Sequence, residues 1–241
     1  MTELKQQTPD AMTQVAAPRA EISMKSELIR KSIHLSSIGI PLIYGLAGRE
    51  IMLWLLVPAT VFTLIIEVLR FTKPSVEARV RSSFGGIMRE HELDGSHKKI
   101  SGAAWVLLSA TFCVIVFPTI ITIAAFTTLI VSDTAAALIG RKYGRHKFLE
   151  KSFEGSTAFF VTSFCVVTAV MLLYDAPMLF LTTGAAAALA ATAAEALSSG
   201  ANIDDNLTIP TSFAFVQWGL IALVGGPDAE RIWQFGRSVF G

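Results

Sequence analysis

Asp133 stands inside a long apolar stretch, flanked by two hydroxyl side chains in the sequence Ser132-Asp133-Thr134. It precedes Arg141 by eight residues, which places it about 12 Å from the end of a helix that finishes there. An ionisable side chain at that depth is costly unless it is paired or hydrated, and is typical of a functional site. Structural pairing with a neighbouring helix is the alternative. The chemistry open to Asp133 is that of a magnesium ligand or a general base.

A basic loop containing two glycines follows Asp133. It reads Gly140-Arg141-Lys142-Tyr143-Gly144-Arg145-His146-Lys147 and continues with Lys151-Ser152-Phe153-Glu154-Gly155-Ser156. Glycines four residues apart allow close backbone approach, and the surrounding cations suit a polyphosphate. Gly155 and Ser156 are expected to open a helix whose free amides form an anion site. A solvated basic loop is the alternative, and the chain contains no Walker A sequence.

A third polar segment is the stretch from Asn202 to Pro210, which contains Asp204-Asp205-Asn206. Adjacent carboxylates beside amide and carbonyl oxygens suit magnesium, which prefers hard oxygen ligands. A turn followed by a helix cap is the alternative, because Asp and Asn are common at both places. The basic loop on the same side of the membrane favours the metal interpretation.

Two further segments give weaker signals. Near the N-terminus, a polar stripe along one helix face could contact phosphates or mark the membrane interface; its members are Glu27, Arg30, Lys31 and His34. Within 70–99, an apolar stripe is suited to lying on the membrane surface; its members are Val76, Val80, Phe84, Ile87 and Met88. The sequence Arg89-Glu90-His91-Glu92 follows it, and a zinc site there is improbable because the spacing matches no recognised motif.

The composition indicates the elements that must position these residues. Of the 241 residues, 52% are hydrophobic and 16% are charged, and the mean hydropathy is +0.55. These values exclude a disordered, fibrous or nucleic-acid-wrapping chain and argue against a soluble domain. The net charge of +1 names no partner, and two cysteines in apolar runs indicate neither a disulfide framework nor a metal site. The sequence specifies no oligomeric state.

The predicted fold is all-α, a polytopic membrane protein with about seven transmembrane helices. Residues 1–22 are polar and predicted to be a disordered tail, and 23–241 are predicted to form the integral-membrane domain. Most of the apolar stretches reach the length a bilayer requires. The predicted spans are 35–48, 51–69, 100–117, 119–140, 156–174, 177–199 and 209–225.

Lysine and arginine concentrate in three segments. Five precede the first span, seven lie within 70–99 and five within 141–155, which makes 17 of the 20 in the chain. With seven spans, all three segments fall on one side of the membrane. The positive-inside rule therefore places them, the N-terminus and the loop 200–208 in the cytoplasm, and the C-terminus outside.

Taken in order along the chain, these motifs resemble the dolichol, phytol and polyprenol kinase family, which also contains CTP-dependent diacylglycerol kinases. The similarity runs from about Glu27 to Pro210. It implies an enzyme that phosphorylates a lipid alcohol, with CTP as phosphoryl donor and Mg²⁺ as cofactor. Its partners would be the lipid alcohol, the nucleoside triphosphate and membrane lipids, with no nucleic acid. The expected location is a bacterial inner membrane, with the active site facing the cytoplasm.

The resemblance also implies roles for individual residues. Asp133, Lys151 and Asp205 would be catalytic, and Asp133, Asp204 and Asp205 would hold magnesium. The expected nucleotide-binding residues are Arg30, Lys31, His34, Arg89, Glu92, Gly140, Arg141, Gly144, Lys147, Glu154, Gly155 and Asn206.

Two other functions fit parts of the sequence. The portion from Asp133 to Gly155 is similar also to phosphatidate cytidylyltransferases, but the His-Gly-Gly and Asp-Arg patterns of those enzymes are absent from the sequence. A small transporter could use Glu67, Asp133 and Glu195 as a polar pathway. It would be expected to carry inverted repeats and polar groups near the membrane centre. Here the polar residues gather at one face, which favours an enzyme.

Overall fold

The computed structural model describes residues 24–85, 88, 99–149, 151–201 and 204–235, without the side chains of 24–28, 30 and 199–201. The predicted tail 1–22 lies outside these ranges. The described helices are α1 (Met24–Ser36), α2 (Gly39–Thr72), α3 (Pro74–Phe84), α5 (Gly102–Val116), α6 (Thr119–Tyr143), α7 (Phe153–Leu173), α8 (Met178–Ala201), α9 (Asp205–Val224) and α10 (Gly226–Gln234).

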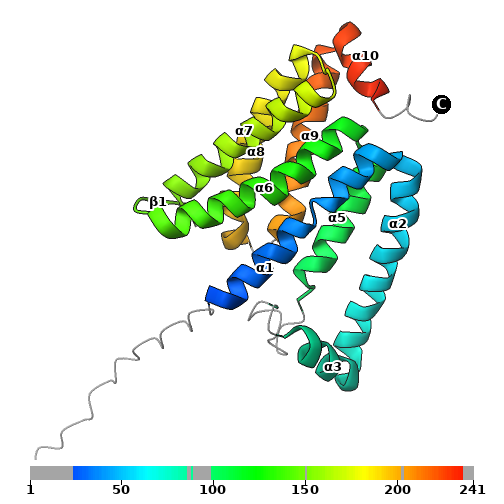
Figure 1. The fold of residues 1–241 in the computed structure, drawn as a ribbon, viewed down its shortest axis with the longest axis vertical. Helices are drawn as coiled ribbons and strands as arrows, with labels where there is room; N and C mark the ends of the chain where they lie inside the picture. The colour runs from blue at the N-terminus through cyan, green and yellow to red at the C-terminus, as the bar shows by residue number, and fades with distance from the viewer. Residues whose placement is uncertain (1–23, 86–87, 89–98, 150, 202–203, 236–241) are drawn as a thin grey trace, which may run out of the picture.

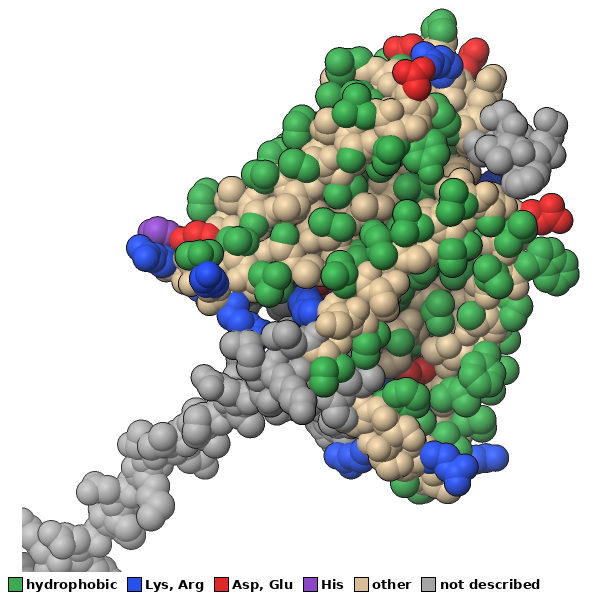
Figure 2. Space-filling view, in the orientation of Figure 1, with side chains coloured by type: hydrophobic (Ala, Val, Ile, Leu, Met, Phe, Trp, Pro, Cys, Tyr) green, Lys and Arg blue, Asp and Glu red, His purple; other side chains and the backbone are tan. Residues whose placement is uncertain are grey.

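The helices are those of a polytopic membrane protein, as predicted. Five helical stretches are long and apolar enough to cross a membrane: 31–72, 119–143, 153–173, 178–198 and 205–224. The apolar helix α5 is shorter than these. Figure 2 shows hydrophobic side chains spread over the flanks of the molecule, with charged side chains gathered toward its ends. This distribution matches a bilayer around the flanks and water at both ends.

A sharp reversal divides α2 into two helical parts. Gly48 has φ 78° and ψ 178°, a conformation that residues with a Cβ rarely adopt. In Figure 1 the chain rises through α1 and the start of α2, turns, and descends through the rest of α2. The predicted boundary between spans 35–48 and 51–69 lies at this turn. Next to it, Arg49 Nη2 donates a hydrogen bond to the carbonyl oxygen of Phe117 over 2.7 Å, which ties the turn to the end of α5.

Helix α6 forms the centre of the bundle. About 72% of its most apolar stretch is buried, a larger share than in the other four candidate spans. It packs against α7, α9, α2 and α1. The alanine-rich stretch of α8 also packs closely: Ala187, Ala188 and Ala191 are fully buried. A Cβ added at Gly184 would overlap Val167 of α7, so small residues set the α7–α8 distance.

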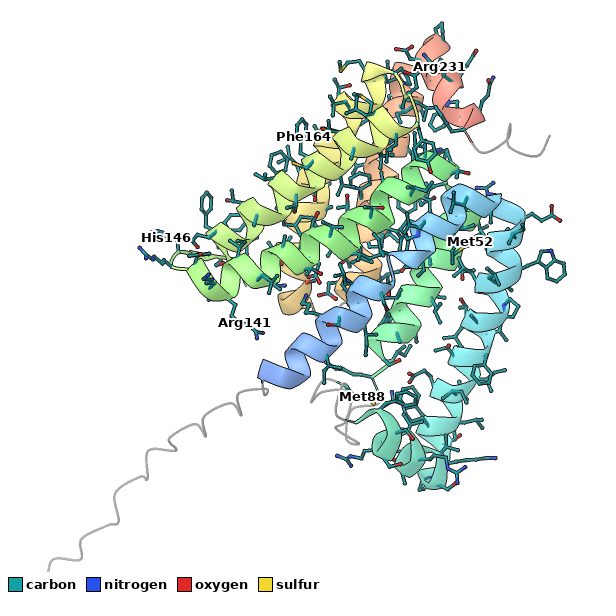
Figure 3. All side chains as sticks on the ribbon, viewed as in Figure 1. Met52, Met88, Arg141, His146, Phe164 and Arg231 are labelled. Atoms are coloured by element: carbon teal, nitrogen blue, oxygen red, sulfur yellow. The ribbon has the colours of Figure 1, made fainter. Side chains whose placement is uncertain are left out.

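The loop between α6 and α7 departs from the all-helical prediction. Its residues form a small antiparallel hairpin, in which β1 (Lys147–Phe148) pairs with β2 (Lys151–Ser152). Figure 3 places Arg141 and His146 of this region at one end of the molecule and Arg231 at the opposite end. The hairpin therefore projects beyond the apolar flanks, and the basic side chains of Arg145 and Lys147 are exposed.

Candidate functional site

Asp133 is the centre of a buried cluster of charged side chains. It is 8% exposed, in the second half of α6. Lys31 of α1 donates a hydrogen bond from Nζ to Asp133 Oδ2 over 2.7 Å, and His34 Nε2 lies 3.7 Å from the same oxygen. The neighbouring hydroxyls of Ser132 and Thr134 instead make hydrogen bonds within and between helices. Ser132 accepts a hydrogen bond from Ser163 of α7, so the chemistry of this motif rests on its carboxylate.

A second ion pair joins the hairpin to α8. Lys151 Nζ lies 2.9 Å from Glu195 Oε1, and Glu195 is 3% exposed. Burial lowers the pKa of Lys151, but the charge and hydrogen bond of Glu195, with the charges of Asp133 and Asp205, outweigh burial and raise it. Lys151 therefore stays protonated at neutral pH. The arrangement holds a permanent cation beside the Asp133 carboxylate.

The segment after α8 brings Asp205 to the same cluster. Asp205 interacts electrostatically with His34 and Lys151, as Asp133 does. Asp204 caps α9, because its Oδ1 accepts hydrogen bonds from the backbone amide and the side-chain amide of Asn206. Asn206 is held in turn by its carbonyl, which accepts a hydrogen bond from Ser109 of α5 over 2.8 Å. The helix-cap alternative thus holds for Asp204, while Asp205 faces the charges.

The glycines of the basic loop pack the hairpin against α6. A Cβ at Gly140 would lie 3.0 Å from Ser152 Oγ, and one at Gly144 would lie 2.9 Å from the same atom. A Cβ at Gly155 would lie 3.1 Å from the carbonyl oxygen of Ala136. The predicted close backbone approach exists. In this structure, the groups that lie close to these glycines are other parts of the protein.

The predicted anion site at the start of α7 is wrong in its details. The helix begins at Phe153, two residues before Gly155. The amide of Gly155 is not free, since it donates a hydrogen bond to Ser152 Oγ over 3.1 Å. Glu154 accepts hydrogen bonds from the amides of Arg145 and His146 and lies 2.8 Å from His146 Nδ1. These contacts give Ser152 and Glu154 the role of shaping the loop that carries Lys151.

A cavity of about 500 Å³ opens beside Asp133. Its polar end contains Lys31, His34, Asp133 and Asn206. The remaining walls are mainly apolar and come from α1, α2, α3 and α5; they include Ile33, Ile40, Phe62, Ile66, Val80, Phe84, Met88, Val106 and Leu107. The α3 stripe predicted to lie on the membrane surface thus contributes Val80 and Phe84 to a cavity wall.

One lining residue of the cavity, Glu67, forms a buried ion pair with Arg70. Arg70 donates hydrogen bonds to Glu67 Oε2 from Nε over 3.1 Å and from Nη2 over 2.6 Å. Arg70 Nη2 also reaches the carbonyl of Lys99, and Glu67 Oε1 accepts from the amide of Ser101. The pair therefore joins the end of α2 to the chain that enters α5. Glu67 is thus held by its own ion pair, and it lines the same cavity as Asp133.

The remaining predicted site residues divide into two groups. Arg141, in the last turn of α6, and Lys147, in β1, are both exposed. Arg89, Glu92 and the side chain of Arg30 lie outside the described residues. Within the described ranges, no group of three or more His, Cys, Asp or Glu side chains is arranged to hold a metal ion.

Glu195 is the site residue that the sequence-based assignment omitted. In sequence, Glu195 had a role only in the transporter alternative, whereas the structure pairs it with Lys151. The signal was an acid in the alanine-rich stretch 184–196, a run otherwise without charge. Such an acid needs a partner, and the partner here is the loop lysine 44 positions earlier in the sequence.

Together, the fold and the cluster define a polytopic membrane protein with paired ionic groups at one end of its helices and an apolar cavity beside them. Comparison with known sequences identifies relatives of this chain. It is 32% identical to an uncharacterized protein of Rickettsia prowazekii over 186 residues, which cover 76% of this chain and 89% of that protein.

Two relatives carry functional names. The chain is 33% identical over 143 residues to CTP-dependent diacylglycerol kinase 1 of Saccharomyces cerevisiae, a match that covers 56% of this chain but only 47% of the yeast enzyme. It is 28% identical over 212 residues to phytol kinase of Synechocystis, covering 80% of this chain and 79% of that enzyme. The chain belongs to the polyprenol and phytol kinase family. No family model matches it, and no solved structure gives a significant match.

Proposed function

We propose that this protein is a CTP-dependent kinase that phosphorylates a membrane alcohol, either an isoprenoid alcohol or diacylglycerol. The observation that carries the proposal is the position of Asp133. It lines the apolar cavity together with Lys31 and His34, and it interacts with the Lys151–Glu195 pair. A lipid hydroxyl in the cavity and a phosphate at Lys151 would therefore both lie near one carboxylate. The names of the yeast and Synechocystis relatives support this donor and this substrate class.

The reaction follows from these positions. The lipid hydroxyl oxygen forms a bond to the γ-phosphorus of CTP while the bond from that phosphorus to the β,γ-bridging oxygen breaks, and its electron pair leaves with CDP. Asp133 or Asp205 takes the hydroxyl proton. Lys151 and the loop cations near Arg141 neutralise charge on the phosphates, which is the main requirement of phosphoryl transfer.

Magnesium fits the acids of the cluster by ligand type, because carboxylate oxygens are the ligands it prefers. Asp133 and Asp205 would hold it with oxygens of the nucleotide, and Asp204 would support them from the cap of α9. Enzymes that bind magnesium–nucleotide complexes commonly supply only one or two carboxylates of their own. When bound, the ion would neutralise phosphate charge.

The proposed topology has seven membrane passes, with the N-terminus and the charged cluster at the cytoplasmic face. The reversal at Gly48 divides the 31–72 stretch into two passes. The helix α5 and the four other long helices supply the remaining five. The loop with Arg141 and His146 then lies in the cytoplasm, where CTP is available, and Arg231 lies outside.

The test uses purified protein in detergent with magnesium, phytol, a longer polyprenol, diacylglycerol and phosphatidate. CTP is labelled on its γ-phosphate in one reaction and on its α-phosphate in another. Transfer of the γ-label to a lipid supports the proposal, and the labelled product identifies the alcohol. Transfer of the α-label would instead identify a cytidylyltransferase. If neither label moves with CTP or with other nucleotides, the kinase proposal is wrong.

A further inference from the structure

The residues that line the cavity beside Asp133 differ in polarity and in exposure. Asp133 and Asn206, at the polar end, are 8% and 6% exposed. Ile33 of α1, Phe62 of α2 and Phe84 of α3 also line the cavity, and they are 48%, 64% and 55% exposed. The polar residues beside Asp133 are therefore buried, whereas three of the apolar lining residues are exposed on the surface of the molecule. We call Ile33 and Phe62 the portal.

The portal lies on a flank of the molecule that faces the bilayer. Ile33 and Phe62 both belong to the apolar stretch 31–72, whose most apolar part is only 22% buried. Other large apolar side chains of α2, among them Trp54, Leu55 and Ile65, are also exposed. An exposed apolar surface on a membrane-spanning helix contacts lipid tails. Ile33 of α1 and Phe62 of α2 therefore join the cavity lining to a surface that faces hydrocarbon.

We propose that the substrate enters this cavity sideways from the bilayer, passing between Ile33 and Phe62 with its hydroxyl leading toward Asp133. The inference rests on the proposed kinase function and adds the route and the residues that select the substrate's tail. The chemistry of the walls matches one occupant: an alcohol with its polar group at the end of an apolar chain. Its hydroxyl reaches Lys31, His34 and Asp133, and its chain lies along Phe62, Ile66 and Leu107.

A sideways route is also the one that costs least. A long-chain alcohol that approached through water would expose every methylene group of its chain, and each exposure is unfavourable. Through the portal the chain exchanges lipid neighbours for apolar side chains, and only the hydroxyl changes its surroundings. At the polar end the hydroxyl gains hydrogen-bonding partners that the bilayer centre lacks.

The kinetic test narrows the portal and compares long and short substrates. Ile33→Trp should raise the KM for a long-chain alcohol in vesicles about tenfold or more, with little effect on a short water-soluble prenyl alcohol. The matched control is Ile65→Trp, because Ile65 is 51% exposed on α2 and does not line the cavity. Phytol and diacylglycerol are assayed in separate vesicles, and the one that wild type phosphorylates is used. If Ile33→Trp affects long and short alcohols equally, the portal is wrong.

A binding measurement separates the portal from the kinase chemistry. In a protein with Cys113→Ala and Cys165→Ala, Phe62→Cys and Ile65→Cys are each treated with a membrane-permeant thiol reagent. Vesicles containing phytol or diacylglycerol should slow modification of Phe62→Cys and leave that of Ile65→Cys unchanged. Protection without phosphorylation would reject the proposed function and support the portal. Equal modification rates with and without each alcohol would reject the portal, whatever the activity.

Discussion

Lys31 and Asp133 are 102 residues apart in sequence and are joined by a hydrogen-bonded ion pair of 2.7 Å. The pair holds α1 against α6 and forms part of the cavity wall. On the hairpin side, Lys151 and Glu195 form the second pair, at 2.9 Å. Each cation is thus matched by an acid in this structure, which compensates the cost of placing four charges among apolar helices. A bound nucleotide with magnesium would supply new partners for both ion pairs: phosphates for the lysines and the metal ion for the acids.

Asp133→Asn should lower kinase activity at least about 100-fold, because the amide can neither accept the hydroxyl proton nor bind magnesium as a carboxylate does. Membrane insertion should be retained, since the two side chains have the same shape. The measurement is transfer of γ-label from CTP to the alcohol. Thr134→Val is the control, because the Thr134 hydroxyl donates to the Ile130 carbonyl of its own helix. Activity of Asp133→Asn near the wild-type level would contradict the assignment.

Glu195→Gln should make activity more sensitive to alkaline pH. Burial lowers the pKa of Lys151, and Glu195 is the main reason that the pKa is nevertheless raised. Without the carboxylate charge the pKa falls, so Lys151 loses its proton at a lower pH than in wild type. The alkaline limb of the pH–rate profile should therefore move to lower pH.

The control for this profile is Glu50→Gln, which removes an exposed carboxylate two residues after the Gly48 turn of α2. It should leave the alkaline limb in place. The Glu195→Gln rate could instead fall by the same factor at every pH, with the limbs at wild-type pH values. That result would indicate that Glu195 has a structural role and does not hold the charge of Lys151.

The membrane class and the need of Asp133 for a partner were predictable from sequence, because both follow from local pattern. Apolar length predicts a span, and an acid within a span predicts a partner. The partner itself was not predictable. Lys31 was assigned to the nucleotide, and Glu195 to another function. Ion pairs between distant helices depend on helix rotation and packing, which hydropathy does not encode.

In the loop between α6 and α7, the contact partners of residues were also not predictable, although these partners are close in sequence. Gly140 and Gly144 were correctly expected to allow close approach, but the sequence cannot state what approaches. In the structure it is Ser152 of the hairpin. The hairpin itself is held by contacts of Glu154 with the amides of Arg145 and His146, and a two-residue strand has no periodicity to detect.

Gly155→Ala should destabilise the protein by about 1–3 kcal/mol, because the added methyl group is forced against well-packed neighbours. Its Cβ would lie 3.0 Å from Ser152 Oγ, 3.1 Å from the Ala136 carbonyl oxygen and 3.3 Å from Gly140 Cα. Thermal unfolding in detergent measures the effect. Gly219→Ala is the matched control, since a methyl group added there would meet nothing within 4 Å and alanine favours the helix. Equal melting temperatures for the two variants would show that the hairpin is not packed as described.

Single cysteines should be labelled from opposite sides of the membrane when placed at His146 and at Asp228. The His146 side chain is 78% exposed at the hairpin, and Asp228 is exposed in α10. Three long helices, α7, α8 and α9, separate the two positions, and an odd number of passes reverses the side. A membrane-impermeant maleimide on intact cells should modify Asp228→Cys, and on inverted vesicles His146→Cys, in a protein without native cysteines. Glu50→Cys should follow Asp228→Cys, because six passes lie between them in the proposed topology. Modification of all three from one side would reject that topology and, with it, the cytoplasmic position of the charged cluster.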